Sequence, residues 1–334
     1  MRKTPALLSA VAVAAVVVAS LVGCSASGSG CTPQYSSGDA SKLVKVSGAV
    51  KKEATASFPT PLVVKNGGSQ VTQDDAGTGA KIQNGDQVDF QYTVFSGKTG
   101  EALGTSGFGA SGSATPRAAA ITSSKGKATN SLVRSLLCAT SGERYTLVTT
   151  AKDGFGAGAL TSNGVTDSQT LVVVVEVEDH FLGKANGVNQ LPKDGLPSVV
   201  TAVDGQPGIV IQEIDEPKDL SIATIKAGSG AVVKKGATVH VKYTGWTWPA
   251  AGEKPTTWDQ TTWDNDQAVD LPVTSTADGG SLPVGLYQAI LGAKVGSQVL
   301  AVIPPKDGFA SGSAPSGVDA DSTLIMVIDI LGIA

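Results

Sequence analysis

The chain of 334 residues has only three cysteines, two histidines and no cluster of lysine and arginine. No serine, cysteine or glutamate stands at a triad-like spacing from His180 or His240, so hydrolase chemistry has no support. The net charge of −4, without a basic cluster, gives no indication of nucleic-acid binding. Residues 107–112 are glycine-rich but lack the strand–loop–helix setting of a phosphate-binding loop. We therefore expect no cofactor, no metal and no nucleic-acid partner.

The N-terminus also lacks a long hydrophobic run. Its apolar stretch, residues 6–19, is shorter than the roughly 20 residues of a bilayer-spanning helix. Because Arg2 and Lys3 precede it, the segment is typical of a signal peptide. The sequence Leu-Val-Gly-Cys that ends at Cys24 resembles the bacterial lipoprotein box, in which the chain is cut before an acylated cysteine. An ordinary signal peptide with a chance cysteine and an uncleaved membrane anchor are the alternatives.

This resemblance implies a lipoprotein signal peptide over residues 1–23 and a lipidated Cys24. The chain would then be exported and anchored by lipid to the outer face of the cytoplasmic membrane. Residues 24–40 are predicted to be the lipidated cysteine and a flexible tether, because serine and glycine dominate their first part. Outside the cytoplasm two remaining cysteines commonly pair, so we expect a Cys31–Cys138 disulfide, with two free buried thiols as the alternative.

An internal repeat organises the rest of the chain. Three segments recur at nearly constant offsets of 151 to 154 residues, which indicates two copies of one fold with small insertions. The matching pairs are residues 88–93 and 239–244, residues 152–155 and 306–309, and residues 170–175 and 323–328. We place the copies at residues 41–187 and 188–334, joined by a polar connection over residues 183–195.

Each copy is predicted to be rich in β-strands. Apolar and polar residues alternate in several runs, as along Val239, Val241 and Tyr243, which is the pattern of half-buried strands. One short helix is expected from about Pro283 to Gly292, with an apolar stripe. The stripe consists of Leu286, Ala289, Ile290 and Ala293.

Five landmarks follow one another in the second copy. They are a Val-Lys-Tyr-Thr-Gly strand at 241–245, the pair Trp258–Asp259 followed by threonines, a helix ending near Val295–Gly296, an Ile-Pro-Pro turn at 303–309, and a closing strand at 323–331. Their order resembles the FKBP-type peptidyl-prolyl cis/trans isomerase family. The resemblance implies an α+β fold of two FKBP-like domains, each an antiparallel sheet wrapped around one short helix.

The resemblance also implies the site residues. Tyr243, Asp259 and Phe309 correspond to catalytic positions of the family. The substrate-binding pocket would be lined by Trp258, Val269, Leu282, Pro283, Leu286, Val318 and Met326. Val269 and Leu286 replace larger aromatic residues, and Phe309 replaces a tyrosine and so lacks its hydroxyl, which widens the pocket and puts turnover and inhibitor affinity in doubt.

Two readings of these residues stay open. Tyr243, Leu286 and Met326 could be ordinary core residues. Trp263–Asp264 offers a rival match to Trp258–Asp259, which we prefer for its spacing to Val269.

The first copy departs further from the family. Tyr92 and Phe155 are kept, but Leu103–Gly104 replaces the aromatic–acid pair, and Thr149–Ala151 replaces the Ile-Pro-Pro turn. An insert rich in glycine, serine and alanine, residues 106–128, lies where the pocket rim is expected. The first copy is therefore predicted to be degenerate, with a binding or spacer role.

The sequence as a whole indicates a bacterial, actinobacterial-like lipoprotein that isomerises prolyl bonds in proline-containing segments of exported polypeptides. A macrolide would be a weak ligand. The alternative is a non-catalytic FKBP-like lipoprotein that binds proline peptides or acts as a chaperone. A solute-binding lipoprotein of a transporter fits the lipid anchor but does not fit the repeat.

Overall fold

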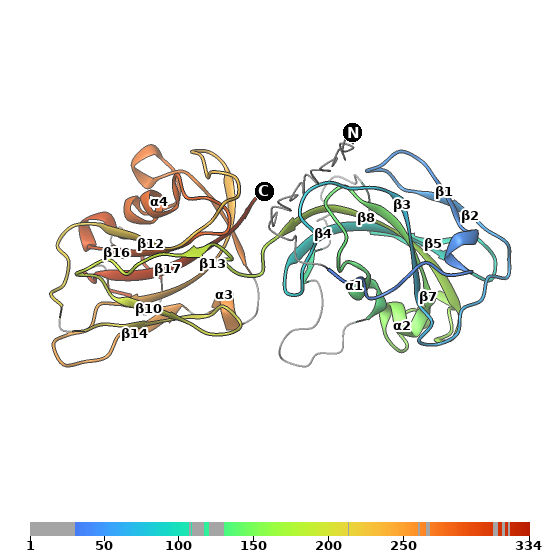
Figure 1. Cartoon of the computed structure of the whole chain (residues 1–334), viewed down its shortest axis with the longest axis horizontal. Helices are drawn as coiled ribbons and strands as arrows, with labels where there is room; N and C mark the ends of the chain where they lie inside the picture. Colours follow the sequence, from blue (N-terminus) through green and yellow to red (C-terminus); the bar gives the residue numbers. More distant parts are fainter. Residues whose placement is uncertain are drawn as a thin grey trace, which may run out of the picture. The chain divides into compact units, whose positions relative to one another are not determined.

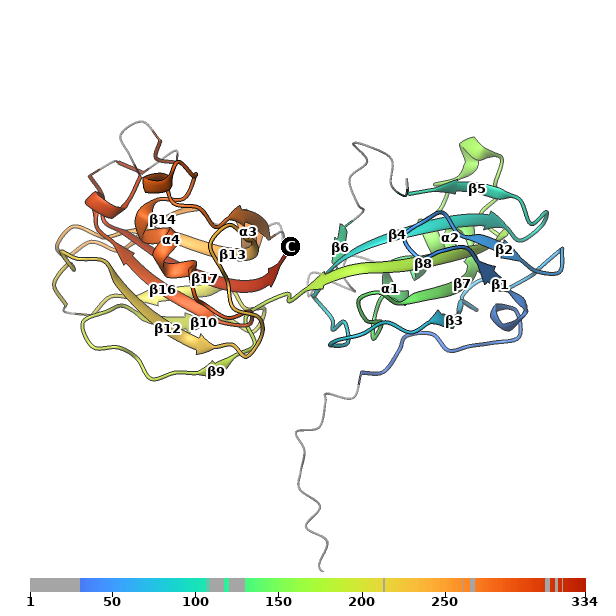
Figure 2. The same cartoon turned by 90° about the horizontal axis from the view of Figure 1, so that it is seen from above.

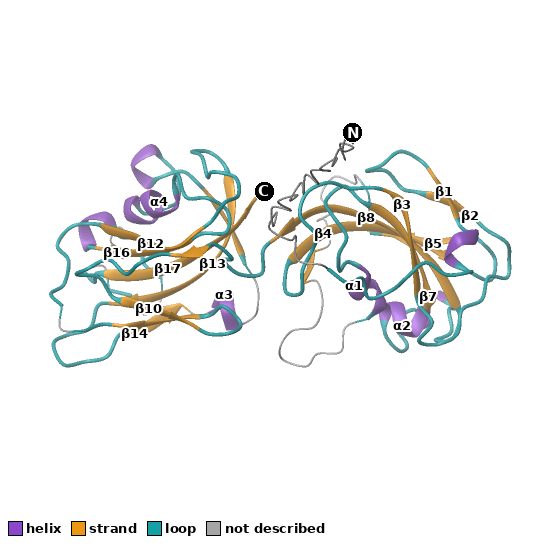
Figure 3. Cartoon of the chain, in the orientation of Figure 1, coloured by secondary structure: helices purple, strands orange, loops and turns teal. Residues whose placement is uncertain are grey.

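The structure is a computed structural model of the chain, and it describes most of the residues after Gly30 (Figure 1). The described residues are 31–106, 108, 117–119, 130–212, 214–259, 261–264, 268–309, 313–315, 318–319 and 321–334, with the backbone alone for 117–119, 259, 261 and 264. Strands dominate and helices are few and short (Figure 3). The fold is α+β and is built on antiparallel sheets.

The first sheet has the strand order β3-β7-β8-β4-β5, with β6 paired to β4. Its strands are β3 (Gln70–Asp75), β4 (Gln87–Ser96), β5 (Ala102–Thr105), β6 (Arg117–Ala119), β7 (Arg144–Thr150) and β8 (Thr170–Phe181). The long strands β4 and β8 run side by side through this sheet (Figure 2). The helices α1 (Ser131–Ser135) and α2 (Ala151–Phe155) and the 3-10 turns η1 (Ser41–Leu43) and η2 (Thr161–Asn163) accompany it.

The second sheet repeats this order strand for strand as β12-β16-β17-β13-β14, with β15 paired to β13 and the short β9 added beside β12. Its strands are β9 (Val188–Asn189), β12 (Ser221–Ala227), β13 (Thr238–Thr247), β14 (Thr256–Asp259), β15 (Val269–Pro272), β16 (Gln298–Ile303) and β17 (Leu324–Ile333). It carries the helices α3 (Thr261–Asp264) and α4 (Val284–Ile290) and the 3-10 turns η3 (Thr276–Asp278) and η4 (Pro305–Asp307).

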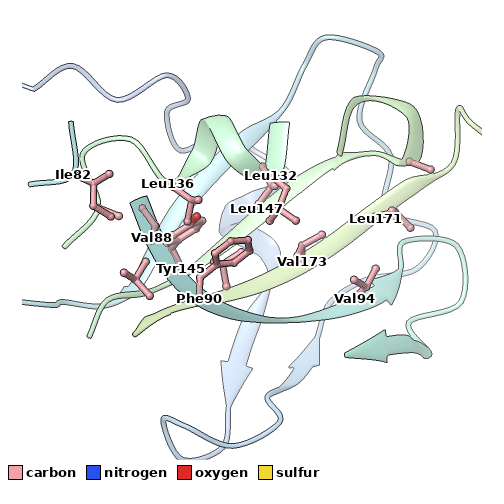
Figure 4. Close-up of a cluster of buried hydrophobic side chains, with 14 of the residues drawn as sticks. Ile82, Val88, Phe90, Val94, Leu132, Leu136, Tyr145, Leu147, Leu171 and Val173 are labelled. Carbon is pink, nitrogen blue, oxygen red and sulfur yellow. The ribbon is translucent and has the colours of Figure 1, made fainter. Parts of the chain in front are cut away.

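Each sheet is covered on both faces. One face holds the main core, which in the first sheet gathers Phe90, Leu136, Tyr145 and Leu147 among others (Figure 4). The opposite face is covered by a small hairpin that precedes each sheet in the chain. These hairpins are β1 (Lys45–Ser47) with β2 (Thr55–Ser57), and β10 (Ser198–Thr201) with β11 (Pro207–Val210). Figure 1 shows α4 and β10 on opposite sides of the second sheet.

Helix α4 forms where the apolar stripe predicts it. Leu286, Ala289 and Ile290 are buried in the core of the second sheet, and Ala293 packs against that core. The helix begins after Pro283 and ends at Ile290, two residues before the expected end at Gly292, whose φ of +80° favours glycine.

The N-terminal part of the body differs from the sequence prediction. Residues 24–40 were expected to be a flexible tether, but residues 31–40 are fastened to the first sheet. The Val71 amide donates to the Ser36 carbonyl, and the Ala40 amide donates to the Gln70 side chain at 3.0 Å. The polar composition of this segment leads to the prediction of a tether. Composition alone does not show that strand β3 offers the segment hydrogen-bond partners.

Candidate active site

The candidate site is an apolar cluster of side chains on one face of the second sheet, which we call the second bowl. Strand β13 contributes Tyr243, β17 contributes Met326, and α4 contributes Leu286, all in one apolar cluster. The other predicted pocket residues in this cluster are Trp258, Val269, Leu282, Phe309 and Val318. Pro283 is buried at the start of α4. The structure therefore brings the predicted pocket residues together.

Trp258 depends on a glycine in the neighbouring strand. Strands β13 and β14 are paired so that Gly245 lies opposite Asp259. Gly245 therefore lies beside Trp258 on the face of the second bowl. A Cβ atom at Gly245 would overlap the Trp258 indole, which shows how closely the ring lies on the backbone. The indole meets the Phe309 ring edge to face, with centroids 6.2 Å apart and planes at 88°. These two rings form one aromatic wall of the bowl.

Helix α4 is held against the sheet by another close approach. A Cβ atom at Gly285 would overlap the Ile303 side chain on β16. Glycine therefore lets the helix lie near the strand, and Leu286 beside it is buried with 6% of its surface exposed. The floor of the bowl is aliphatic where the family resemblance implied a tryptophan.

The rim of the bowl is the segment that runs from β14 into α3. The Asp259 backbone pairs with Gly245, and the Asp259 side chain lies outside the described residues. The Thr262 hydroxyl is bonded to the backbone of Tyr243, accepting from its amide at 3.1 Å and donating to its carbonyl. Thr262 thus ties the rim to the strand that carries the pocket tyrosine.

The two rival tryptophans lie on different sides of the sheet. Trp258 belongs to the second bowl, whereas Trp263 is buried and stacks against the Lys242 ammonium, with Nζ 4.9 Å from the ring centroid. Lys242 alternates with Val241 and Tyr243 along β13 and therefore faces away from the bowl. Gly245, Thr262 as an anchor, and Lys242 were not singled out from the sequence. The Thr after Trp258–Asp259 was the one signal available for Thr262.

The first sheet has a site equivalent to the second bowl, with different side chains at several positions. Tyr92 packs against Phe155 with ring centroids 6.0 Å apart, so the two retained aromatic residues also meet there. The register pairs Val94 with Gly104, which puts Val94 and Leu103 at the places of Gly245 and Trp258. Val94 is buried in the core, and Leu103 packs against the same core. Most of the predicted insert, residues 106–128, lies outside the described residues.

The cysteines fall into two groups. Cys31 and Cys138 form a disulfide, with Cα atoms 5.5 Å apart and a sequence separation of 107. It joins the N-terminal segment to the residues that follow α1. Cys24 lies outside the described residues, as does the expected signal peptide.

Among the residues that the structure describes, no group of three or more histidine, cysteine, aspartate or glutamate side chains could hold a metal ion. Within the same residues, no helix is long and apolar enough to cross a membrane.

Two open cavities lie outside the second bowl. The larger, of about 660 Å³, is lined by Asp215 to Lys218, Pro304, Pro305 and Thr323. The smaller, of about 450 Å³, lies between β10 and the β9–β12 edge. Both have more polar than apolar lining, unlike the cluster around Tyr243, so we assign the candidate site to the bowl on the strength of its side chains.

Comparison with known proteins agrees with this geometry. A family model described as FKBP-type peptidyl-prolyl cis-trans isomerase matches residues 230–331, which span β13 to β17 and so include the whole second bowl. Residues 230–331 are an FKBP-type isomerase domain. No curated protein matches the chain.

Several solved FKBP structures resemble the chain. The three FKBP domains of wheat FKBP73 share 18% identity and a TM-score of 0.31, over 80% of this chain and 95% of that one. FkpA from Escherichia coli shares 22% identity and a TM-score of 0.29, over 42% and 52%. FKBP12 from Mycobacterium tuberculosis shares 27% identity and a TM-score of 0.26, over 35% and 86%.

Proposed function

We propose that the second bowl catalyses cis/trans isomerisation of prolyl bonds in exported polypeptides, at the outer face of the cytoplasmic membrane. We further propose that residues 41–187 are a degenerate copy of the same fold with a binding or spacer role. The observation that carries the proposal is the apolar cluster around Tyr243, whose predicted pocket residues all lie within residues 230–331 and which includes the Trp258–Phe309 wall.

An apolar bowl is suited to this reaction. An X–Pro bond isomerises in tens of seconds unaided, because twisting the amide breaks its resonance and costs roughly 20 kcal/mol. The planar amide carries more charge separation than the twisted one, so a dry apolar site disfavours the planar form. Donors that meet the displaced carbonyl stabilise the twisted state in particular. The reaction needs no nucleophile, metal or general base.

The residues of the bowl divide this work. Trp258, Leu286, Met326 and Phe309 supply the apolar surroundings of the proline ring. Tyr243 is half-buried and its hydroxyl is the donor for the twisted carbonyl. Asp259, at the rim, orients that tyrosine and stabilises the polar surroundings of the peptide.

The test is a prolyl isomerase assay on the whole chain and on an Asp259→Ala variant. Losing one charge-assisted hydrogen bond costs on the order of 1.5–3 kcal/mol, or roughly ten- to hundredfold in rate. We expect kcat/KM to fall by that factor while the unfolding free energy stays within about 1 kcal/mol. Asp278→Ala, which removes an exposed ion pair with Lys235 and no side chain of the bowl, is the control and should keep full activity.

A non-catalytic binding module is the second candidate, and Leu286 and Phe309 favour it because they replace the larger or hydroxylated residues of the family. The same assay separates the two. A chain that binds proline peptides without accelerating isomerisation would support the binder, and an Asp259→Ala variant as fast as the wild type would contradict the assigned role of Asp259.

The location rests on the lipoprotein box that ends at Cys24. Acyl chains on this cysteine would hold the body at the membrane surface. A Cys24→Ala variant should keep its full precursor mass, whereas the wild type should be processed and stay with the membrane fraction. Wild-type protein that washes off the membrane, together with a variant still cut before position 24, would rule the anchor out.

A further inference from the structure

A row of buried polar side chains crosses the back of the second sheet, on the face opposite the bowl. The strand register puts Lys242 on β13 beside Asp329 on β17, Asp329 beside Gln298 on β16, and Gln298 beside Lys226 on β12. Lys242 and Asp329 are each 1% exposed and Gln298 is fully buried. Lys226 at the end of the row is half-buried. The other three polar groups are costly to bury unless they are hydrogen-bonded.

The connecting segment 183–187 provides those bonds. The Lys242 ammonium donates to the Gly183 carbonyl at 3.1 Å, and the Ala185 amide donates to the Asp329 carboxylate at 2.8 Å. The Gln298 amide donates to the other Asp329 oxygen at 2.8 Å. These hydrogen bonds attach residues 183–187, which lead into the second half of the chain, to the back of the second sheet.

The first sheet carries an equivalent row, which shows that this is a repeated feature of the molecule. Gln91, Glu176, Arg144 and Asp75 are aligned across β4, β8, β7 and β3. The Glu176 carboxylate accepts from the Lys51 amide at 2.6 Å, and Arg144 donates to the Gly48 carbonyl at 2.9 Å. Here too the row holds backbone from the segment that precedes the sheet, in this case the turn between β1 and β2.

The same row reaches the rim of the bowl through Lys242. Its ammonium lies over the buried Trp263 ring, and Trp263 belongs to α3, which directly follows the Trp258–Asp259 pair. A cation over a buried aromatic ring is attracted to the ring face, and this attraction is stronger when water is excluded. In the first sheet the equivalent residue, Gln91, likewise bonds to the rim residue Ser106. Both sheets therefore link the row behind the sheet to the rim in front.

We propose that Lys242 is a positioning residue of the second bowl. Its ammonium is held by the connecting segment and in turn fixes the Trp263 ring. Because Trp263 belongs to α3, this contact also sets the position of the Trp258–Asp259 pair at the rim. The inference rests on the proposed function of the bowl. Two anchors then set the place of α3, the Thr262 hydroxyl on the Tyr243 backbone and the Trp263 ring on Lys242. Loss of the second anchor leaves the rim attached but displaced from its productive position, which lowers turnover.

A double-mutant cycle on the whole chain tests this. Lys242→Met keeps the apolar stem and removes the charge, and Trp263→Leu removes the ring. Each should lower kcat/KM roughly tenfold, and the double variant should be no slower than the slower single variant, because both remove one interaction. Amide hydrogen exchange over residues 261–264 should rise in all three variants.

Two matched controls separate positioning from plain destabilisation. Gln91→Leu changes the equivalent residue of the first sheet and should leave kcat/KM within twofold. Leu300→Ala opens a cavity on the same face as Lys242 without touching the row, so it should lower stability and leave kcat/KM unchanged at a temperature where it is folded.

The outcomes are distinct from those that decide the proposed function. A wild-type chain without isomerase activity contradicts the proposed function, and the exchange of residues 261–264 in Lys242→Met then still decides whether Lys242 fixes the rim. Additive losses in the double variant, or unchanged exchange over 261–264, overturn the positioning role.

Discussion

At the scale of single residues, the two sheets differ at one pair of neighbouring positions. The second sheet has a glycine beside a tryptophan there, and the first sheet has a valine beside a leucine. The second bowl has Gly245 beneath Trp258, whereas the first sheet has Val94 beside Leu103. By the strand register, Val94 and Leu103 take the places of Gly245 and Trp258. This exchange conserves volume, which cores tolerate well, and it replaces an aromatic wall by an aliphatic one.

We predict that Gly245→Val expels the Trp258 indole from the wall. The unfolding free energy should fall by about 1–3 kcal/mol, because the added valine overpacks the core. The value of kcat/KM should fall more than tenfold. The paired variant Gly245→Val with Trp258→Leu copies the first sheet and should regain stability without activity. Denaturant unfolding and the isomerase assay check both effects, and recovery of activity in the paired variant would show that the aromatic wall is dispensable.

The titration of Asp329, in the row behind the second sheet, makes the stability of the fold depend on pH. Burial raises the pKa of this carboxyl to about 6, although the hydrogen bonds from Ala185 and Gln298 and the nearby Lys226 and Lys242 oppose the rise. The folded state therefore binds this proton more tightly than the unfolded chain, in which aspartate has a pKa of about 3.9. The stability from this group is present at low pH and is lost as the pH rises through about 6.

We therefore expect Asp329→Asn to change the pH dependence of stability. Between pH 5 and pH 7.5 the wild type should lose about 1.4 kcal/mol that the variant does not lose, because stability changes by about 1.4 kcal/mol per pH unit below a pKa of about 6. Urea unfolding of both proteins at several pH values measures the difference. A wild-type protein whose stability relative to the variant grows with pH would mean that Lys226 and Lys242 outweigh the burial of the carboxylate.

The sequence predicted the residues of the bowl better than those behind it. Tyr243, Leu286 and Met326 follow alternation or a helical stripe, and the family landmarks place them in one pocket. Lys242 alternates with apolar neighbours, so β13 resembles a half-buried strand with a polar face in water, whereas Asp329 is the one charged residue in the apolar run of β17. That pattern cannot show that a distant segment covers the polar face, because the covering residues are not neighbours in sequence.

At the scale of elements, the long strands and α4 could be predicted, and the two covering hairpins could not. Strands β1 and β2 have three residues each, so alternation has too few positions to be recognised. Val46 and Ala56 of this hairpin's strands and Ala54 of its turn pack on the first sheet. The hairpin β10–β11 follows the same plan with Val199 and Ile209. Their place is set by contact with a sheet that forms from later residues.

The disulfide fastens the N-terminal segment that leads into the first of these hairpins. Cys31 and Cys138 close a loop with a sequence separation of 107 residues, and chain entropy gives an upper bound of about 4–5 kcal/mol for such a loop. We predict that the Cys31→Ser, Cys138→Ser double variant loses 2–4 kcal/mol of unfolding free energy. Guanidinium unfolding measures the loss. Two free thiols on labelling of the unfolded, non-reduced wild type would exclude the disulfide.

At the scale of the whole molecule, the repeat in the sequence corresponds to two sheets with the same strand order. The offsets of 151 to 154 residues predict this because equivalent strands lie equally far apart in the chain. The sequence also indicates which bowl departs from the family, at Leu103–Gly104. Activity in one bowl alone is therefore the central claim about the molecule.

Matched substitutions in the whole chain test that claim most directly. Phe309 packs on Trp258 in the second bowl, and Phe155 packs on Tyr92 in the first. We predict that the wild type accelerates isomerisation of an X–Pro peptide and that Phe309→Ala lowers kcat/KM about tenfold or more, since a buried aromatic contact contributes on the order of 1.5–3 kcal/mol. Phe155→Ala should stay within twofold of the wild type. An inactive wild type, or a Phe155→Ala variant as impaired as Phe309→Ala, would contradict the account.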